Sequence, residues 1–342
     1  MPTTLKAPFP YFGGKSRIAA IVWDRLGDVH NFIEPFFGSG AVLLARPHEP
    51  KIETVNDIDG MIANFWRALQ AEPEAVAKWA DWPVSEVDLE ARHVWLVGQK
   101  ASLGAALKAD PEYYDVKIAG WWVWGLCSWI GAGWCAGKSS GINRKRPHLG
   151  DAGRGINRRL PHLGDAGQGI NRKLPHLGNA GKGINRQRPH LGTAGNGING
   201  KNYALLEYFN ALSVRLRRVR VCCGDWSRVC GPSVTVKLGL TGVFLDPPYL
   251  SKDRDPNIYA HESRTVAHDV REWAIEQGKN QLMRIALCGY EDEHIMPADW
   301  KCVAWKAQGG YGSQANKQGR KNKDRERIWF SPACLKMDDL FS

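Results

Sequence analysis

The apolar positions in the C-terminal half of the chain predict an α/β sheet. Residues 242–245 form a short apolar run that is typical of a buried β-strand. Residues 266–275 have the pattern of a helix, and residues 281–290 form a further apolar run, so we expect a helix followed by a strand. This order is typical of a doubly wound sheet, in which ligands bind beyond the carboxyl ends of parallel strands.

A second strand is predicted near the N-terminus, followed by a glycine-rich turn and a helical pattern over residues 32–44. Gly38 and Gly40 in the turn let the backbone approach a bound cofactor, as in dinucleotide-binding units. Asp57 follows Gly38 by about twenty residues, the offset at which an acidic side chain binds ribose hydroxyls. A phosphate-binding P-loop at residues 11–16 is disfavoured because Phe9 replaces its first glycine.

The Asp-Pro-Pro-Tyr tetrapeptide at residues 246–249 directly follows the strand predicted at 242–245. Asp246 and the Pro247 carbonyl can accept the two hydrogens of an exocyclic amine, and the Tyr249 ring offers a face for stacking a nucleobase. The alternative is that Asp-Pro-Pro only starts a turn. The upstream glycine turn favours the chemical interpretation, with Asp246, Pro247, Pro248 and Tyr249 as candidate catalytic residues.

Residues 118–136 contain five tryptophans and could suggest a membrane segment. Their glycines and short uncharged length favour a buried helix followed by a turn. The eight cysteines have no paired C-x-x-C spacing, so we expect reduced thiols in a cytosol and no metal site. The N-terminus lacks the apolar core of a signal peptide, which favours a cytoplasmic protein.

A 14-residue repeat begins at Gly141 and recurs from Gly155, Gly169 and Gly183. Proline and glycine in each copy exclude a continuous helix or a long strand through the array. Residues 141–200 carry eleven Lys and Arg against two Asp, a net charge of 11 − 2 = +9. The whole chain is +11, so the remainder is 11 − 9 = +2, and the array is suited to contact a polyanion. The alternative is a duplicated surface loop without a role.

Four motifs resemble, in this order, those of Dam-type DNA adenine methyltransferases of bacteria and phages. They are residues 11–15, 34–40, 56–59 and 246–249. The resemblance spans nearly the whole chain and extends weakly to residues 223–226 and 326–332. It implies a Rossmann-like methyltransferase sheet with an inserted DNA-recognition region. The expected segments are the cofactor-binding half of the methyltransferase domain at 1–84, the target-recognition insertion at 85–200 with the repeats at 141–200, and the catalytic half at 201–342.

The resemblance also implies S-adenosylmethionine as methyl donor and the 6-amino group of adenine in duplex DNA as acceptor. Asp246 and the Pro247 carbonyl would hold the amine, and Tyr249 would stack on the flipped base. Tyr11 and Lys15 would contact the methionine end of the cofactor. The implied cofactor residues are Tyr11, Lys15, Glu34, Pro35, Phe36, Gly38, Gly40, Asp57, Asp225 and Asp246.

In the resemblance, the repeats occupy the place of the target-recognition region. The DNA-binding candidates there are Arg144, Lys145, Arg158, Arg159, Arg172, Lys173 and Arg186. We expect double-stranded DNA as the partner, no membrane association, and a monomer in the cytoplasm of a bacterial host. Two alternatives stay open, an amino-cytosine methyltransferase and a catalytically idle DNA-binding protein. Ring-carbon methylation is disfavoured because the chain has no Pro-Cys dipeptide. Tyr290 fits either a base pocket or core packing.

Overall fold

The structure, a computed structural model, describes residues 5–11, 14–129, 134–135, 203–249, 265–305 and 325–336. The 14-residue repeats at 141–200 lie outside the described residues, and so do residues 306–324. The predicted DNA-binding residues of the repeats therefore stay a prediction.

A seven-stranded sheet with the order β3-β2-β1-β4-β5-β7-β6 forms the centre of the described part. The strands β1 to β5 run parallel, and β7 is antiparallel to both of its neighbours. This mixed α/β architecture is compatible with a methyltransferase fold. The strands are β1 (Asn31–Glu34), β2 (Ile52–Asp57), β3 (Val219–Cys223), β4 (Thr241–Leu245), β5 (Met283–Tyr290), β6 (Lys301–Ala304) and β7 (Glu326–Phe330).

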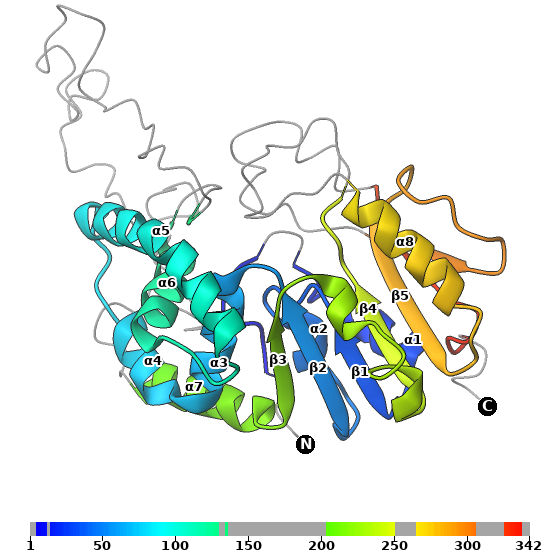
Figure 1. Cartoon of the computed structure of the whole chain (residues 1–342), viewed down its shortest axis with the longest axis horizontal. Helices are drawn as coiled ribbons and strands as arrows, with labels where there is room; N and C mark the ends of the chain where they lie inside the picture. The colour runs from blue at the N-terminus through cyan, green and yellow to red at the C-terminus, as the bar shows by residue number, and fades with distance from the viewer. Residues whose placement is uncertain are drawn as a thin grey trace, which may run out of the picture.

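Helices cover the sheet, and a group of helices lies beyond its β3 edge (Figure 1). The helix α8 lies over β5, whereas α3 to α7 gather at the β3 end, where α6 packs against α3, α4 and α5. The predicted boundary at residue 84 falls between α4 and α5, and the division into three segments stays a prediction. The α-helices are α1 (Ala19–Leu26), α2 (Ala41–Leu44), α3 (Gly60–Ala71), α4 (Pro73–Ala80), α5 (Glu86–Ala109), α6 (Val116–Ser128), α7 (Tyr203–Leu216) and α8 (Val266–Gln277).

The elements predicted from the apolar pattern are present. The run at 242–245 forms β4, which is buried at every position because it lies between β1 and β5. The patterns at 266–275 and 281–290 correspond to α8 and β5. Residues 118–128 of the tryptophan-rich segment lie in α6. In the part of the chain that the structure describes, no helix has the length and apolarity needed to cross a membrane.

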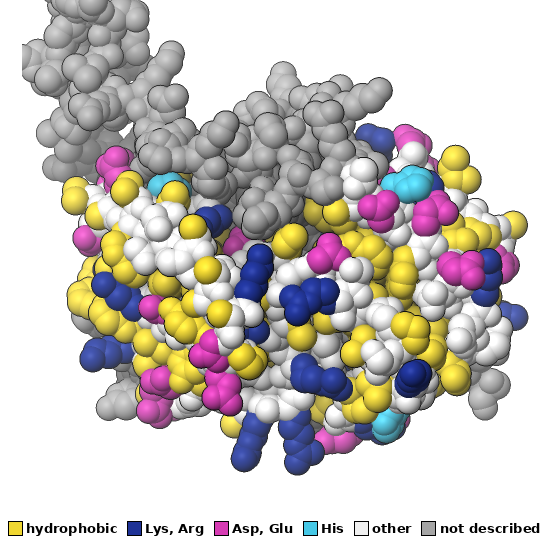
Figure 2. All heavy atoms as spheres, viewed as in Figure 1, with side chains coloured by type: hydrophobic (Ala, Val, Ile, Leu, Met, Phe, Trp, Pro, Cys, Tyr) yellow, Lys and Arg dark blue, Asp and Glu magenta, His cyan; other side chains and the backbone are white. Residues whose placement is uncertain are grey.

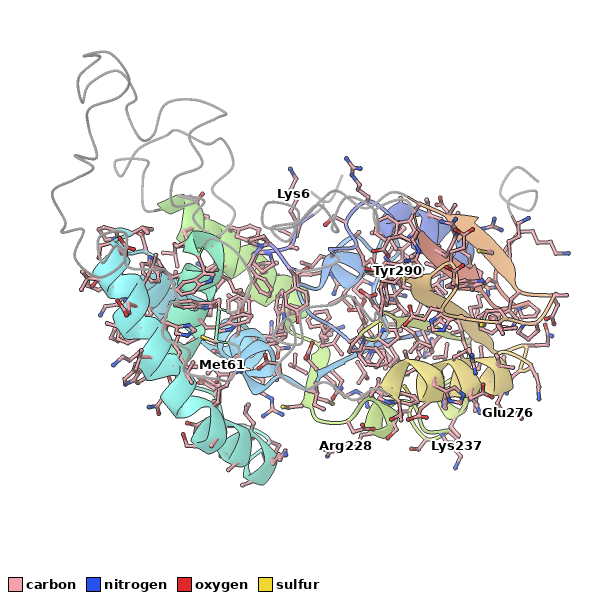
Figure 3. The ribbon with its side chains drawn as sticks, turned by 90° about the horizontal axis from the view of Figure 1, so that it is seen from above. Lys6, Met61, Arg228, Lys237, Glu276 and Tyr290 are labelled. Carbon is pink, nitrogen blue, oxygen red and sulfur yellow. The ribbon has the colours of Figure 1, made fainter. Side chains whose placement is uncertain are left out.

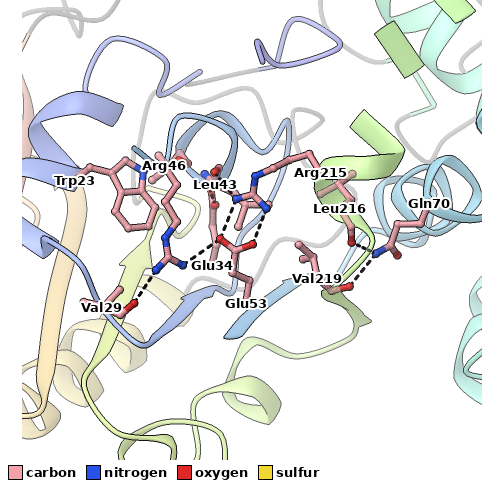
Figure 4. A network of polar contacts seen from close by, with 11 residues as sticks. Trp23, Val29, Glu34, Leu43, Arg46, Glu53, Gln70, Arg215, Leu216 and Val219 are labelled. Atoms are coloured by element: carbon pink, nitrogen blue, oxygen red, sulfur yellow. Dashed lines mark hydrogen bonds and ion pairs between the residues drawn. The ribbon is translucent and has the colours of Figure 1, made fainter. Parts of the chain in front are cut away.

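Two arginines hold a buried glutamate at the base of the sheet (Figure 4). Glu53 of β2 is 3% exposed, and its carboxylate accepts hydrogen bonds from Arg46 at 3.1 Å and from Arg215 of α7 at 2.6 and 2.9 Å. The second nitrogen of Arg46 donates to the Val29 carbonyl, and Arg215 donates to that of Leu43. This network therefore links α7, which follows the repeats, to β2 and to the helix after the glycine turn.

Lys and Arg side chains also gather on the face of the molecule over β3 (Figure 2). Arg217, Arg218 and Arg220 are exposed there, and Arg228 continues the basic surface beside the end of β3. Arg228 and Lys237 lie on this same side in the view from above, whereas Tyr290 lies away from it (Figure 3). Although the net charge of the chain outside the repeats is small, positive side chains are concentrated on this face.

Replacing Glu53 with alanine is expected to lower the free energy of unfolding by about 3–5 kcal/mol, because two guanidinium groups would lose their buried counter-charge. Urea denaturation followed by circular dichroism measures the change. Glu276→Ala is the matched control, since Glu276 pairs with Lys279 on the surface at 67% exposure of both side chains. Its loss should cost less than about 1 kcal/mol. Equal losses in the two variants would contradict the structural role of the Glu53 network.

Candidate active site

The predicted site residues converge at the carboxyl edge of the sheet. Parallel strands end on the same side, so the segments after β1, β2, β3 and β4 meet there. These segments contain the glycine turn at 35–40, Asp57, Asp225 and Asp246. Four of the short motifs found in the sequence are thereby brought to one side of the protein.

The glycine turn is tied to the end of β2 through Asp57. Gly38 has φ +48°, and its N–H donates to Oδ2 of Asp57 at 3.0 Å, while Oδ1 accepts from the N–H of Asp59 at 2.9 Å. The indole of Trp66 donates to the Gly38 carbonyl at 2.9 Å. Burial raises the pKa of Asp57 to about 7, and the two backbone hydrogen bonds oppose the rise. A cofactor hydroxyl donating to this carboxylate would supply a further hydrogen bond to the charged form.

Tyr11 lies against the glycine turn, where a β-carbon on Gly38 would approach its ring to 2.7 Å. The glycine is required here both by its positive φ and by the closeness of this ring. Lys15, four residues after Tyr11, is only 5% exposed and points to the end of β4 instead of to the turn. The two residues predicted to hold the methionine end of the cofactor therefore contact different walls of the site.

Glu34 and Pro35 hold the turn together from within. The carboxylate of Glu34 is 3% exposed and accepts the N–H of Leu43 at 3.2 Å, which joins β1 to α2. Burial raises the pKa of Glu34 well above its usual range, and the hydrogen bond opposes this. The Pro35 carbonyl accepts from Asn56, whose amide also donates to the Gly224 carbonyl at 2.9 Å. Asn56, which the sequence analysis did not select, thus connects the segments after β1 and β3.

Phe36 and Asp225 lie at the outer side of this edge. The Phe36 ring stacks on Trp226 with centroids 6.5 Å apart, and both rings are half-buried. Asp225 is exposed and accepts hydrogen bonds from the N–H and hydroxyl of Ser227 at 3.0 and 2.5 Å. The arrangement offers flat apolar surface beside a carboxylate, which is suited to an adenine ring.

Asp246 occupies the end of β4 and is held by two neighbours. Its Oδ2 lies 2.9 Å from Nζ of Lys15, and its Oδ1 accepts from the Tyr249 hydroxyl at 3.0 Å. Burial lowers the pKa of Lys15, but Asp246 and the other acidic neighbours raise it more, so the net direction is upward. Lys15 therefore stays charged beside Asp246. Pro247 is buried and Pro248 half-buried beside this pair.

Three further side chains complete this wall, and sequence reasoning gave them no role or left their role open. Glu326 of β7 accepts from the Tyr249 hydroxyl at 3.1 Å, and the rings of Tyr249 and Tyr290 meet edge to face at 4.7 Å. Trp305, after β6, lies with its ring centroid 5.5 Å from Nζ of Lys15. The sequence offered a signal for Glu326, which lies in the weak C-terminal motif at 326–332. It offered none for Trp305, because the contacts of Trp305 depend on the antiparallel pairing of β6 and β7.

The glycine turn and the two strands that flank it also have a counterpart among known proteins. Residues 11–82 match the family model described as D12 class N6 adenine-specific DNA methyltransferase. This segment is similar to that class. The match confirms the resemblance to Dam-type adenine methyltransferases, a family of enzymes, and it implies methylation of adenine with DNA as substrate. No curated protein matches the chain.

The D12 segment accounts for part of the site. It contains Tyr11, Lys15, the glycine turn and Asp57, whereas Asp246, Tyr249 and Glu326 come from later strands. Within the described residues, no group of three His, Cys, Asp or Glu side chains is arranged to hold a metal ion. All eight cysteines are free thiols.

Gly38→Ala is expected to destabilise the protein by at least about 1–2 kcal/mol, because alanine is strained at positive φ and its β-carbon would displace Tyr11. Thermal unfolding measures this. Gly98→Ala in α5 is the matched control, since an added β-carbon there meets nothing within 4 Å and helix propensity gains about 1 kcal/mol. A Gly38→Ala protein as stable as the parent would show that the turn tolerates a side chain.

Proposed function

We propose that this protein transfers a methyl group from S-adenosylmethionine to the 6-amino group of adenine in duplex DNA. The observation that carries the proposal is the position of Asp246. This carboxylate ends β4, is held by Lys15 and Tyr249, and lies at the same sheet edge as the D12 glycine turn. A methyl donor bound at the turn and an amine bound at Asp246 would meet there.

The charge at this edge fits a cationic donor. Asp246 and Asp57 both act electrostatically on Glu34, so three carboxyl groups share the region with the ammonium of Lys15. When bound, S-adenosylmethionine supplies a sulfonium methyl group that an amine can attack. We propose that Asp57 accepts a hydrogen bond from its ribose and that the Phe36 and Trp226 rings flank its adenine. The Gly38 turn would support the bound molecule from below.

Asp246 is suited to accept a hydrogen bond from the adenine amine. Accepting that bond, together with the Pro247 carbonyl, concentrates the nitrogen lone pair and orients it toward the methyl group. A covalent enzyme intermediate is not required. Cys288 is fully buried near Asp246, and burial and then the Asp246 charge raise the pKa of its thiol well above the usual range, so it stays an unreactive neutral thiol.

A base within a duplex has to leave the helix to reach Asp246. We propose that Tyr249 offers the stacking surface for the extruded adenine. Its ring is partly buried, with Tyr290 at its edge and Nζ of Lys15 at 5.3 Å from its centroid. An aromatic surface of this kind offsets part of the stacking energy lost from the duplex, about 1–3 kcal/mol per base.

We propose that the repeats at 141–200 contact the phosphate backbone. Their net charge of 11 − 2 = +9 is large for sixty residues, and they stand between the D12 segment and β4 in the chain. Phosphate contacts of this kind give affinity without sequence specificity. A duplicated loop without a role is the alternative.

Asp246→Ala is expected to lower methylation of duplex DNA by at least about 100-fold, because the amine loses its charged acceptor. Nucleoside mass spectrometry of DNA incubated with enzyme and S-adenosylmethionine measures 6-methyladenine. Asp292→Ala, which removes an exposed partner of Arg325, is the control and should retain parental activity. Circular dichroism checks that both variants are folded.

The same assay separates the alternative functions. Formation of 4-methylcytosine without 6-methyladenine would identify an amino-cytosine methyltransferase with the same mechanism. Absence of both products, together with no binding of S-adenosylmethionine in calorimetry, would favour a DNA-binding protein without catalysis. Retained activity in Asp246→Ala would show that the amine binds elsewhere.

Deletion of residues 155–196, three copies of the repeat, removes seven Lys and Arg and one Asp. DNA affinity is expected to fall and its dependence on salt to become shallower, since fewer counterions are released on binding. Fluorescence anisotropy with a labelled duplex at several salt concentrations measures both quantities. Affinity for S-adenosylmethionine serves as the internal control and should not change. A salt dependence equal to that of the full chain would support the duplicated-loop alternative.

A further inference from the structure

The hydroxyl of Tyr249 lies between two carboxyl groups. Its oxygen is 3.0 Å from Oδ1 of Asp246 and 3.1 Å from Oε2 of Glu326. A phenol has one hydrogen and can donate it in one direction at a time. The two carboxyl groups therefore compete for one donor, unless one of them is protonated and donates to the phenol.

Glu326 comes from a different part of the chain than Lys15, the other charged neighbour of this pair. It is the first residue of β7, paired with Tyr290 of the antiparallel strand β5, and is 6% exposed. The β7 backbone holds it rigidly, since the Trp305 N–H donates to the Glu326 carbonyl at 3.2 Å. Glu326 therefore reaches Asp246 through Tyr249, and no direct hydrogen bond between the two carboxyl groups is needed for them to interact.

We propose that Glu326 is a positioning residue that directs the Tyr249 hydroxyl and thereby determines whether Oδ1 of Asp246 is free to accept the substrate amine. This inference rests on the proposed methylation of an amine at Asp246. Glu326 touches neither substrate nor cofactor in this scheme. Its effect passes through the single hydrogen of Tyr249.

The scheme has two states. When Glu326 is ionised, Tyr249 donates to it, and Oδ1 of Asp246 is open to the amine. When Glu326 is protonated, it donates to the Tyr249 oxygen, and Tyr249 donates to Oδ1, which is then occupied. Lys15 holds Oδ2 in both states, at 2.9 Å. The first state is competent to bind the amine, and the second is inhibited.

The surroundings of Glu326 permit both states. Burial raises the pKa of its carboxyl group, Lys15 lowers it, and Asp246 raises it. Tyr249 lowers it by donating its hydrogen, and Glu293 after β5 raises it. Cys288 of β5 also faces the group as a neutral thiol, and the chain neighbours of Glu326 in the strand segment are Arg325 and Arg327. The net direction of the pKa shift is upward, so Glu326 takes up a proton at a higher pH than an exposed glutamate does, and acidification would favour the inhibited state.

Glu326→Gln tests the inference through activity. A neutral amide is a weaker acceptor than the Asp246 carboxylate, so Tyr249 should turn to Asp246 and the amide N–H should donate to the phenol oxygen. We expect kcat to fall about tenfold, the equivalent of one charge-assisted hydrogen bond. The acid limb of the pH profile that arises from Glu326 should also disappear.

The effect of Glu326→Gln can be compared between the parent protein and the Tyr249→Phe variant, which lacks the hydroxyl. Without the hydroxyl, only the through-space electrostatic interaction between Glu326 and Asp246 is left, so adding Glu326→Gln to the Tyr249→Phe variant should lower kcat much less than it does in the parent. Loss of packing or of stability would instead lower activity by the same factor in both backgrounds. An equal fall in both backgrounds would overturn the inference.

The state of the hydroxyl can be followed without catalysis, which separates this inference from the proposed function. With ¹³C at the ring carbon that bears the hydroxyl, the Tyr249 NMR signal, assigned through Tyr249→Phe, should shift with pH as Glu326 titrates. The shift should be absent in Glu326→Gln. A signal that titrates in a protein without methyl transfer would leave the relay intact and refute the function. A Tyr249 signal unaffected by Glu326→Gln would refute the relay itself.

Discussion

The ion pair between Lys15 and Asp246 is the interaction on which the site depends. Lys15 comes from the N-terminal segment and Asp246 from the end of β4, and the two charges lie 2.9 Å apart in a largely buried region. The attraction between the two opposite charges offsets part of the cost of burying them. The pair also fixes the Asp246 side chain, so that a hydrogen-bond acceptor is held at the mouth of the sheet.

The acidic side chains of the site have different structural roles. Glu34 and Asp57 hold the backbone of the glycine turn through N–H groups, and burial raises the pKa of each. Asp246 instead faces a cation and a phenol. The division follows from hydrogen bonding, because the first two carboxylates are already partnered by backbone donors, whereas Asp246 has side-chain partners that can turn.

A second network of buried charges stabilises the sheet that carries the site. Arg46 and Arg215 enclose Glu53, which connects the helix following the repeats to β2. The helix α7, which follows the repeats in the sequence, is thereby anchored to the sheet.

The local sequence was sufficient for the individual elements. Period and composition located β4, α8, β5 and the strand–turn–helix around Gly38, because burial of a strand or a helix face imposes an apolar pattern on neighbouring residues. The motif at 246–249 and the glycine turn were recognised because each is contiguous. The sequence alone thus determined the family resemblance and most of the candidate residues.

Only the tertiary structure decided how those residues meet. Strand order brought Lys15 to Asp246, and the antiparallel β7 placed Glu326 against Tyr249, although 77 residues separate the two in the chain. No local pattern reports such contacts, because they depend on sheet pairing and not on neighbouring residues. The role of Asn56 was missed for the same reason, since its two partners lie in the segments after β1 and β3, which the sheet alone brings together.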